Sequence, residues 1–424
     1  MHYQLATGGL HLIASPAADV CRHIFTAQCF DQIASVQIAT GFTCNNIILH
    51  KLGAYADALN KDKEAILGLV AFAASAKDII LEKKYMRALI TIAAFLLLLG
   101  CNNGNKNGSV AVSDYFNYGD TAARTAGIKM IPINTPLGTF KVWTKRIGNN
   151  PRIKVLLLHG GPAMTHEYLE AFESFFPQEG FEFYEYDQLG SYRSDQPTDS
   201  SLWTIDRFVD EVEQVRIALG LNKDNFYLYG NSWGGMLAME YALKHQENLK
   251  GLIIGNMMSS IPQYAQYQKK LHAQMPKDKV DSIMDYEAKK QFSDPNYTRL
   301  LMQEYYSKHV CRLPEWPESV NRSFKHINYP IYLLMQGPSE FSVGGRLLNW
   351  DRSADLKNIT VPTLTVGATY DTMDPEHMKW MSTQVKRGRF LLCPEGGHLC
   401  MWDDQKHFFP GVVQFIRDVD EGKF

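Results

Sequence analysis

A serine between two glycines, at a junction between an apolar run and a helix-like stretch, restricts the fold of this chain more than any other feature. Residues 230–235 read Gly-Asn-Ser-Trp-Gly-Gly, after the apolar run 226–229 and before the helix-like stretch 236–245. Glycines two residues before and after Ser232 let a strand and a helix approach closely, while the serine is held on a strained turn with its hydroxyl exposed. The pattern predicts a nucleophile elbow at Ser232.

Three further pieces appear in the order that such an elbow requires. His-Gly-Gly-Pro at 159–162 follows an upstream apolar run, Asp371 follows a late apolar run, and His398 lies near the end of the chain. The order serine, aspartate, histidine is that of the α/β-hydrolase fold. A glycine-flanked serine alone arises by chance in many chains, so the combination carries the prediction.

The chemistry of a serine nucleophile assigns roles to these residues. Ser232 needs a neighbouring base, for which His398 is the candidate, and the base needs an orienting carboxylate. Two aspartates compete for that third role. Asp371 lies nearer the end of the apolar run, whereas Asp374 directly precedes Pro375 and is typical of a helix N-cap with proline at the first helical position. We therefore assign Asp371 to the triad and Asp374 to the cap.

An acyl-transfer site also needs two N–H donors for the oxyanion of the tetrahedral intermediate. The backbone N–H of Trp233, directly after the serine, is one. Gly161 is the expected second donor, because the next residue, Pro162, has no N–H. No histidine or cysteine spacing typical of a metal site and no phosphate or dinucleotide motif is present, so we expect no cofactor.

The order of apolar runs and helical patterns indicates a mostly parallel sheet with helices on both faces. Runs 128–134 and 138–144 predict a hairpin before that sheet. Residues 121–256 and 351–424 are predicted to form the core. The proline-punctuated, helical and charged segment 257–350 is predicted to be an inserted helical cap over the catalytic end of the sheet.

Composition excludes some partners. The chain has 424 residues, 45% of them apolar and 21% charged, with a formal net charge of −2. This is a globular composition without the basic field that nucleic-acid binding requires. A small molecule or peptide is the expected partner.

The segment before the catalytic part has the pattern of an export signal. Residues 86–101 are predicted to be a lipoprotein-type signal. Basic residues at 83–87 lead into its apolar stretch, which is too short to span a bilayer and is followed by Cys101. Leu-Leu-Gly-Cys at 98–101 resembles a bacterial lipobox, which implies a lipidated Cys101 and an exported, membrane-anchored protein. Residues 102–120 are the expected linker, and 1–85 are an unassigned extension outside the mature chain. A buried core helix is the alternative for the apolar stretch.

Several motifs together resemble the proline iminopeptidase family of serine aminopeptidases, close to its tricorn-interacting aminopeptidase branch. They are the segments at 159–162, 187–190, 230–235, 335–341 and 397–398. The resemblance covers residues from about 128 to the C-terminus. It implies an enzyme that releases proline or another N-terminal residue from short peptides through an acyl-enzyme, with Glu340 of the cap binding the free α-ammonium group.

The chain departs from the family pattern at three positions. Thr372 stands where a glutamate commonly follows the triad aspartate, Ala163 replaces a glycine after His-Gly-Gly-Pro, and Tyr192 replaces another glycine. Glu304 in the cap is a candidate for the missing second carboxylate. Action on amino-acid amides or simple esters is the alternative enzyme hypothesis, and a non-catalytic, surface-anchored binding protein is the alternative from another class.

Overall fold

The computed structural model describes residues 112–117 and 125–424, beginning with the short helix α6 (Val112–Tyr115). The predicted extension 1–85, the signal segment 86–101 with Cys101, and most of the linker lie outside the described residues. Among the residues that are described, no helix is both long and apolar enough to cross a membrane.

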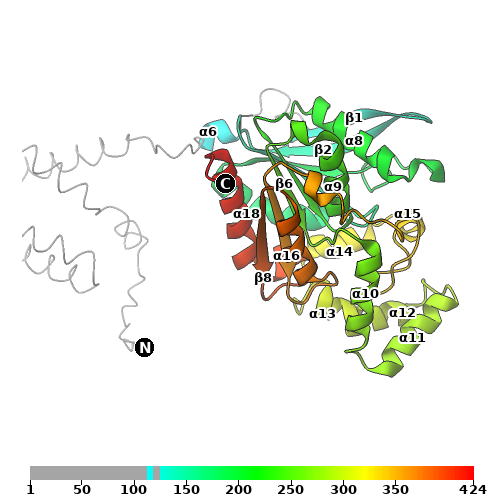
Figure 1. The fold of residues 1–424 in the computed structure, drawn as a ribbon. Helices are drawn as coiled ribbons and strands as arrows, with labels where there is room; N and C mark the ends of the chain where they lie inside the picture. Colours follow the sequence, from blue (N-terminus) through cyan, green and yellow to red (C-terminus); the bar gives the residue numbers. More distant parts are fainter. Residues whose placement is uncertain (1–111, 118–124) are drawn as a thin grey trace, which may run out of the picture. The chain divides into compact units, whose positions relative to one another are not determined.

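One eight-stranded sheet forms the centre of the fold, with strand order β1-β2-β4-β3-β5-β6-β7-β8 (Figure 1). The strands are β1 (Ile128–Thr135), β2 (Gly138–Ile147), β3 (Lys154–Leu158), β4 (Glu182–Asp187), β5 (Phe226–Asn231), β6 (Gly251–Gly255), β7 (Thr363–Ala368) and β8 (Gly388–Cys393). The predicted hairpin is confirmed, because β1 pairs antiparallel with β2 and Thr135 lies opposite Gly138. β2 is antiparallel to β4, and the other neighbours are parallel. The predicted α/β-hydrolase fold is confirmed.

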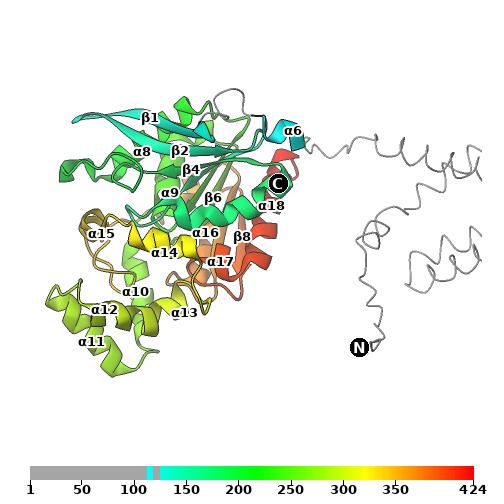
Figure 2. The same cartoon turned by 180° about the vertical axis from the view of Figure 1, so that it is seen from behind.

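Alternate strand residues face opposite layers of helices. Leu156, Leu228 and Ile254 pack with α8 (Ile205–Ala218), α9 (Trp233–His245) and α16 (Pro375–Gln384). Val155 and Tyr229 pack on the other face, with the 3-10 helix η3 (His166–Ser174) and with α18 (Gln405–Asp420). Figure 2 shows this second face, where α18 and the short α17 (Cys400–Asp403) lie. A strand buried on both faces explains the unbroken apolar runs of the sequence.

Helices between β6 and β7 form the segment that the sequence predicts to be a cap. They are α10 (Ile261–His272), α11 (Lys277–Ala288), α12 (Pro295–Leu301), α13 (Ser307–His309), α14 (Glu318–Lys325) and α15 (Tyr329–Met335). A π-helical turn, η7 (Met302–Tyr306), joins α12 to α13. These helices gather at one end of the sheet in both views (Figures 1 and 2).

The two glycines of the elbow are required by close backbone packing. A Cβ atom on Gly230 would overlap the carbonyl oxygen of Gly234, and one on Gly234 would overlap the carbonyl oxygen of Leu158. At both positions the added Cβ would meet backbone atoms, which cannot move aside as the end of a flexible side chain can. Helix α9 can therefore approach β5 closely only because Gly230 has no side chain, and it can approach the end of β3 only because Gly234 has none.

We expect Gly230→Ala to lower the free energy of unfolding by at least ~2 kcal/mol, because the added methyl group forces the strand and helix apart. Urea unfolding of the full chain measures the loss. Gly344→Ala is the matched control, since its Cβ would meet only the Cα of Gly337, at 3.7 Å. Equal unfolding free energies for the two variants would contradict the steric argument.

Candidate active site

Ser232 lies at the turn between β5 and α9. Its backbone has φ 57° and ψ −126°, a left-handed φ that a residue with a side chain rarely adopts. The serine is the N-cap of α9, and only 7% of it is exposed. Strain at this position, maintained by the packing of strand and helix, holds the hydroxyl at the end of the strand.

The predicted contact between the candidate base and acid is present. His398 Nδ1 donates to Asp371 Oδ1 over 2.7 Å. Asp371 also accepts from the N–H of Met373 at 3.0 Å and from Asn256 Nδ2 at 2.7 Å. The carboxylate is fully buried, so these donors hold it in one orientation.

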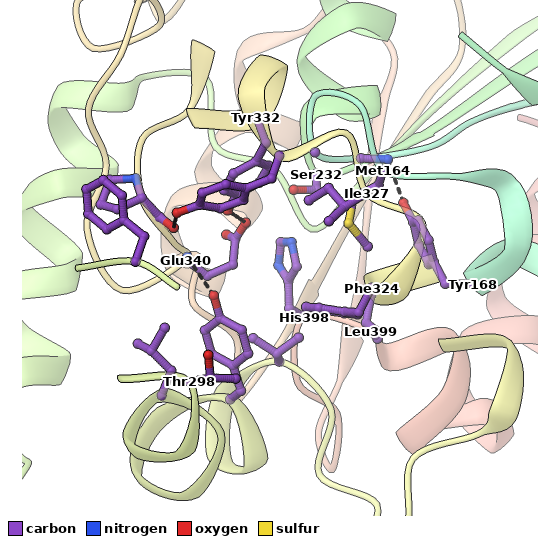
Figure 3. Close-up of a pocket in the computed structure, with 18 of the residues that line it drawn as sticks. Met164, Tyr168, Ser232, Thr298, Phe324, Ile327, Tyr332, Glu340, His398 and Leu399 are labelled. Carbon is purple, nitrogen blue, oxygen red and sulfur yellow. Dashed lines mark hydrogen bonds between the residues drawn. The ribbon is translucent and has the colours of Figure 1, made fainter. Parts of the chain in front are cut away.

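Burial and charge act in opposite directions on His398. Burial alone would lower the pKa of its imidazole, but the charge of Asp371 and the hydrogen bond to it raise the pKa above its ordinary value of 6.5. Its Nε2 is buried and has no hydrogen-bond partner within the described part of the chain. This nitrogen lies in the same cavity as Ser232 (Figure 3), and catalytic hydrogen bonds of this kind often form fully only with substrate bound.

The prediction that Asp374 is a helix cap is confirmed. Asp374 precedes α16, its side chain accepts from the N–H of Glu376, and Pro375 occupies the first helical position. Its carboxylate is therefore committed to the helix terminus, while that of Asp371 orients the imidazole.

The loop after β3 carries Gly161, for which the sequence predicts an oxyanion-donor role. Gly160 already donates its N–H to the hydroxyl of Tyr168, at 2.7 Å. This leaves the N–H of Gly161, at a residue with φ 112°, as the next donor of the loop. Gly160, Gly161 and Ser232 line the same cavity. The N–H of Trp233, the first residue of α9, belongs to the positive end of a helix and is the second predicted donor.

A buried network joins the loops after β3 and β4 to the elbow. Burial lowers the pKa of His159 to about 4. The ring is therefore neutral, and its Nε2 accepts from the N–H of Gln188 at 3.1 Å. Gln188 Nε2 donates to the carbonyl of His159 at 3.0 Å, and Gln188 Oε1 accepts from Trp233 Nε1 at 2.9 Å. These contacts join three motifs that lie far apart in the sequence.

The catalytic groups open into a cavity of about 430 Å³ between the sheet and the cap (Figure 3). Glu340 lies on the wall of this cavity. Among the described residues that line the cavity, Glu340 alone has a carboxylate. The hydroxyl of Tyr332 donates to Glu340 Oε1 at 2.7 Å, and that of Tyr264 lies 3.3 Å from Oε2. The structure thus brings Glu340 together with Ser232 and His398, as expected.

Glu304 does not provide the second carboxylate, and this expectation is wrong. Its side chain lies 3.4 Å from Lys308 on the same helical segment and does not line the cavity. Tyr305 and Tyr306 of the same π-helical turn are buried, whereas Glu304 is only half-buried. Thr372 is buried against the triad, with its hydroxyl 3.3 Å from Asp371 Oδ1, and does not line the cavity either.

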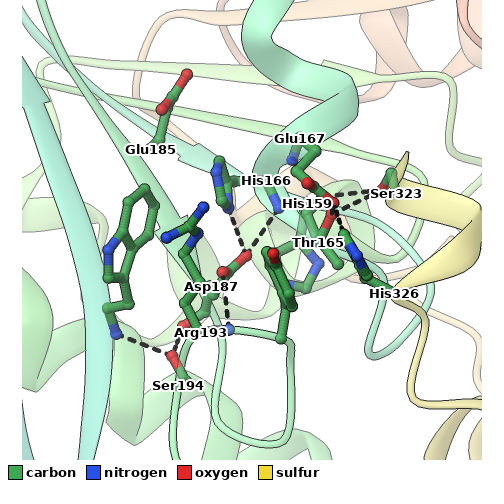
Figure 4. Close-up of polar contacts among 12 residues, drawn as sticks. His159, Thr165, His166, Glu167, Glu185, Asp187, Arg193, Ser194, Ser323 and His326 are labelled. Carbon is green, nitrogen blue, oxygen red and sulfur yellow. Dashed lines mark hydrogen bonds and ion pairs between the residues drawn. The ribbon is translucent and has the colours of Figure 1, made fainter. Parts of the chain in front are cut away.

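Polar contacts fasten the cap to the loop that carries Gly161 (Figure 4). Buried Glu167 of η3 accepts from Arg322 at 2.8 Å and lies 2.7 Å from His326 Nδ1. Two of the departures from the family pattern take part in this region. Ala163 has φ 62°, which explains why glycine is usual there, and Tyr192 stacks on His326 with ring centroids 4.0 Å apart.

Sequence reasoning missed four supporting residues. Tyr168 links Gly160 to Asn231 of the elbow, Asn256 holds Asp371, and Tyr264 and Tyr332 hold Glu340. The position of Asn256 in the sequence could have indicated its role at the site, because it directly follows β6, whose end lies beside the elbow strand. No such indication exists for the tyrosines, since only the folded cap brings them near the glutamate.

Fold and site together define a serine hydrolase of the α/β-hydrolase class. A family model described as the alpha/beta hydrolase fold matches residues 154–405. No group of three or more metal-binding side chains occurs within residues 112–117 and 125–424.

Relatives identify the family. A proline iminopeptidase of Flavobacterium johnsoniae is 64% identical over 295 residues, which are 69% of this chain and 99% of the relative. That of Elizabethkingia meningoseptica is 62% identical over 297 residues, 70% of this chain and 100% of the relative. The crystal structure of the proline iminopeptidase of Mycobacterium smegmatis, 26% identical, superposes with a TM-score of 0.63 over 70% of this chain and 100% of that one. The chain belongs to the proline iminopeptidase family; its place near the tricorn-interacting branch stays a prediction.

We expect Asp371→Asn to reduce kcat/KM by roughly 10³- to 10⁴-fold, and Asp374→Asn to change it little, because asparagine also caps helices. Only a neutral imidazole accepts the serine proton, so wild-type activity falls as pH drops through a pKa above 6.5. Without the charge of Asp371, burial dominates and this acid limb moves to lower pH. Rate profiles against pH measure both effects; a larger loss in Asp374→Asn would show that the wrong acid was assigned.

Proposed function

We propose that this protein is a serine aminopeptidase that releases N-terminal proline from short peptides through an acyl-enzyme. The observation that carries the proposal is the position of Glu340, in the cavity that also holds Ser232 and His398. Membership of the proline iminopeptidase family supports the same activity. An enzyme that removes one terminal residue must recognise the free terminus, and a carboxylate near the nucleophile does so.

A charged amino terminus is the group that Glu340 is suited to bind. The α-nitrogen of an N-terminal proline is a cation with N–H donors, and a charge-assisted hydrogen bond to a carboxylate is worth about 1.5–3 kcal/mol. The hydroxyls of Tyr332 and Tyr264 fix the carboxylate before substrate arrives. Aromatic and aliphatic neighbours such as Tyr306 and Leu301 line the same cavity and suit a compact apolar ring.

The reaction follows from the placement of the catalytic groups. Ser232 attacks the carbonyl carbon of the first residue while His398 takes the hydroxyl proton. The N–H groups of Gly161 and Trp233 stabilise the oxyanion, and His398 then gives its proton to the departing amine. Water activated by the same histidine releases the first residue from the serine.

Export and anchoring are proposed from the sequence. The basic, apolar and Leu-Leu-Gly-Cys succession ending at Cys101 supports lipidation of that cysteine and a membrane-anchored mature protein that begins at Cys101. The curated relatives match about 70% of this chain, a length that corresponds to the hydrolase part alone.

Glu340→Gln tests recognition of the amino terminus. We expect kcat/KM for a prolyl nitrophenyl ester to fall roughly ten- to more than a hundredfold, and that for nitrophenyl acetate, which has no ammonium group, to change much less. Ser232→Ala is the reference variant, and it should lose ~10³-fold or more on both esters. If Glu340→Gln lowered both rates equally, or neither, a general amidase or esterase activity would replace the aminopeptidase proposal.

Cys101→Ser tests the anchor. Metabolic labelling with a radioactive fatty acid in a bacterial host should mark the wild-type protein and not this variant, because only a thiol at the lipobox position is modified. Cys311→Ser is a control, since that cysteine is buried in the hydrolase part. Mass-spectrometric detection of residues 1–85 in the mature protein would refute the proposal.

A further inference from the structure

The cavity has two chemically different ends, with the catalytic groups between them (Figure 3). Glu340 and Tyr332 lie on one side of Ser232 and His398. On the other side lie four apolar side chains, Met164, Phe324, Ile327 and Leu399. These four residues, here called the apolar wall, include no group that could pair with a charge.

The apolar wall is assembled from both the core and the cap. Met164 lies in the loop that carries Gly161, and Leu399 directly follows His398; both are more than nine-tenths buried. Phe324 belongs to α14, and Ile327 follows that helix. The wall therefore exists only where the cap is seated on the catalytic loops.

Contacts around the wall hold its parts in place. Leu399 donates its N–H to the carbonyl of Val310 in the cap at 2.8 Å. In α14, Arg322 contacts Glu167 at 2.8 Å and Glu170 at 2.6 Å, and Ser323 is hydrogen-bonded to Thr165 at 2.9 Å. A wall that is fixed before binding discriminates between side chains better than one that must form on binding.

The direction of the substrate follows from the position of its two recognised groups. With the ammonium group at Glu340 and the scissile carbonyl at Ser232, the peptide beyond the cleaved bond extends away from Glu340. His398 must reach the departing nitrogen, and Leu399 is the next residue in the chain. The second residue of the substrate therefore meets the apolar wall.

We propose that Met164, Phe324, Ile327 and Leu399 form the subsite for the second residue of the substrate and select apolar or aromatic side chains there. This inference rests on the proposed aminopeptidase function. A buried apolar side chain gains roughly ten- to a hundredfold in kcat/KM over glycine. An acidic side chain loses its hydration at the wall without gaining a partner, so it is the poorest occupant.

The experiment compares prolyl dipeptide amides that differ only in the second residue. We expect wild-type kcat/KM to be at least about tenfold higher for Pro-Phe-amide than for Pro-Gly-amide, with Pro-Asp-amide slowest. Ile327→Ser and, separately, Phe324→Ala should bring the Phe/Gly ratio toward one, and a ratio within one variant is insensitive to a general loss of activity. Ile217→Ser is the matched control, because Ile217 is 62% exposed on α8, outside the cavity; it should keep the wild-type ratio.

Two results would overturn the subsite. One is a wild-type ratio near one, or cleavage of Pro-Asp-amide as fast as Pro-Phe-amide. The other is an unchanged ratio in both wall variants. Prolinamide, which has no second residue, separates this failure from failure of the proposed function: its hydrolysis with a flat ratio refutes the subsite alone, whereas no hydrolysis of any prolyl substrate refutes both.

Discussion

The buried side chain of Gln188 joins the three loops from which the active site is built. Its amide contacts the His159 loop after β3 and the Trp233 indole at the start of α9, while its own backbone follows β4. Each contact satisfies a polar group that would be costly to bury alone. This one amide therefore links the loop that carries Gly161 to Trp233, the first residue of α9.

Burial and charge shift the pKa values of the two histidines of this site in opposite directions. His159 is buried with a backbone N–H directed at its ring, and burial lowers its pKa to about 4. His398 is equally buried, but the carboxylate of Asp371 outweighs burial and raises its pKa. The His159 imidazole thereby accepts a backbone hydrogen bond in its neutral form, whereas the pKa of His398 lies above its ordinary value.

The sequence was sufficient for the features that depend on local backbone chemistry. The elbow at Ser232, the cap at Asp374 and the hairpin before the sheet each follow from residues adjacent in the chain. Contacts between residues that only the folded chain brings together could not be predicted from the sequence. Glu304 was a candidate because of its place in the cap, but its carboxylate pairs with Lys308 four residues later and does not line the cavity. Tyr168 contacts Asn231, which lies 63 residues away in the sequence, and no local pattern indicates that contact.

The division of labour between core and cap has an evolutionary consequence. Ser232, Asp371, His398 and Gly161 all follow strands of the sheet, whereas Glu340 and half of the apolar wall come from the segment inserted between β6 and β7. Mutations at the cavity-lining positions of that insertion can alter which molecules are accepted, whereas its contacts with the Gly161 loop and with Leu399 must be kept. Substrate specificity in such an enzyme can therefore change during evolution through mutations in one contiguous stretch of the gene. The residues that carry out bond cleavage need not change.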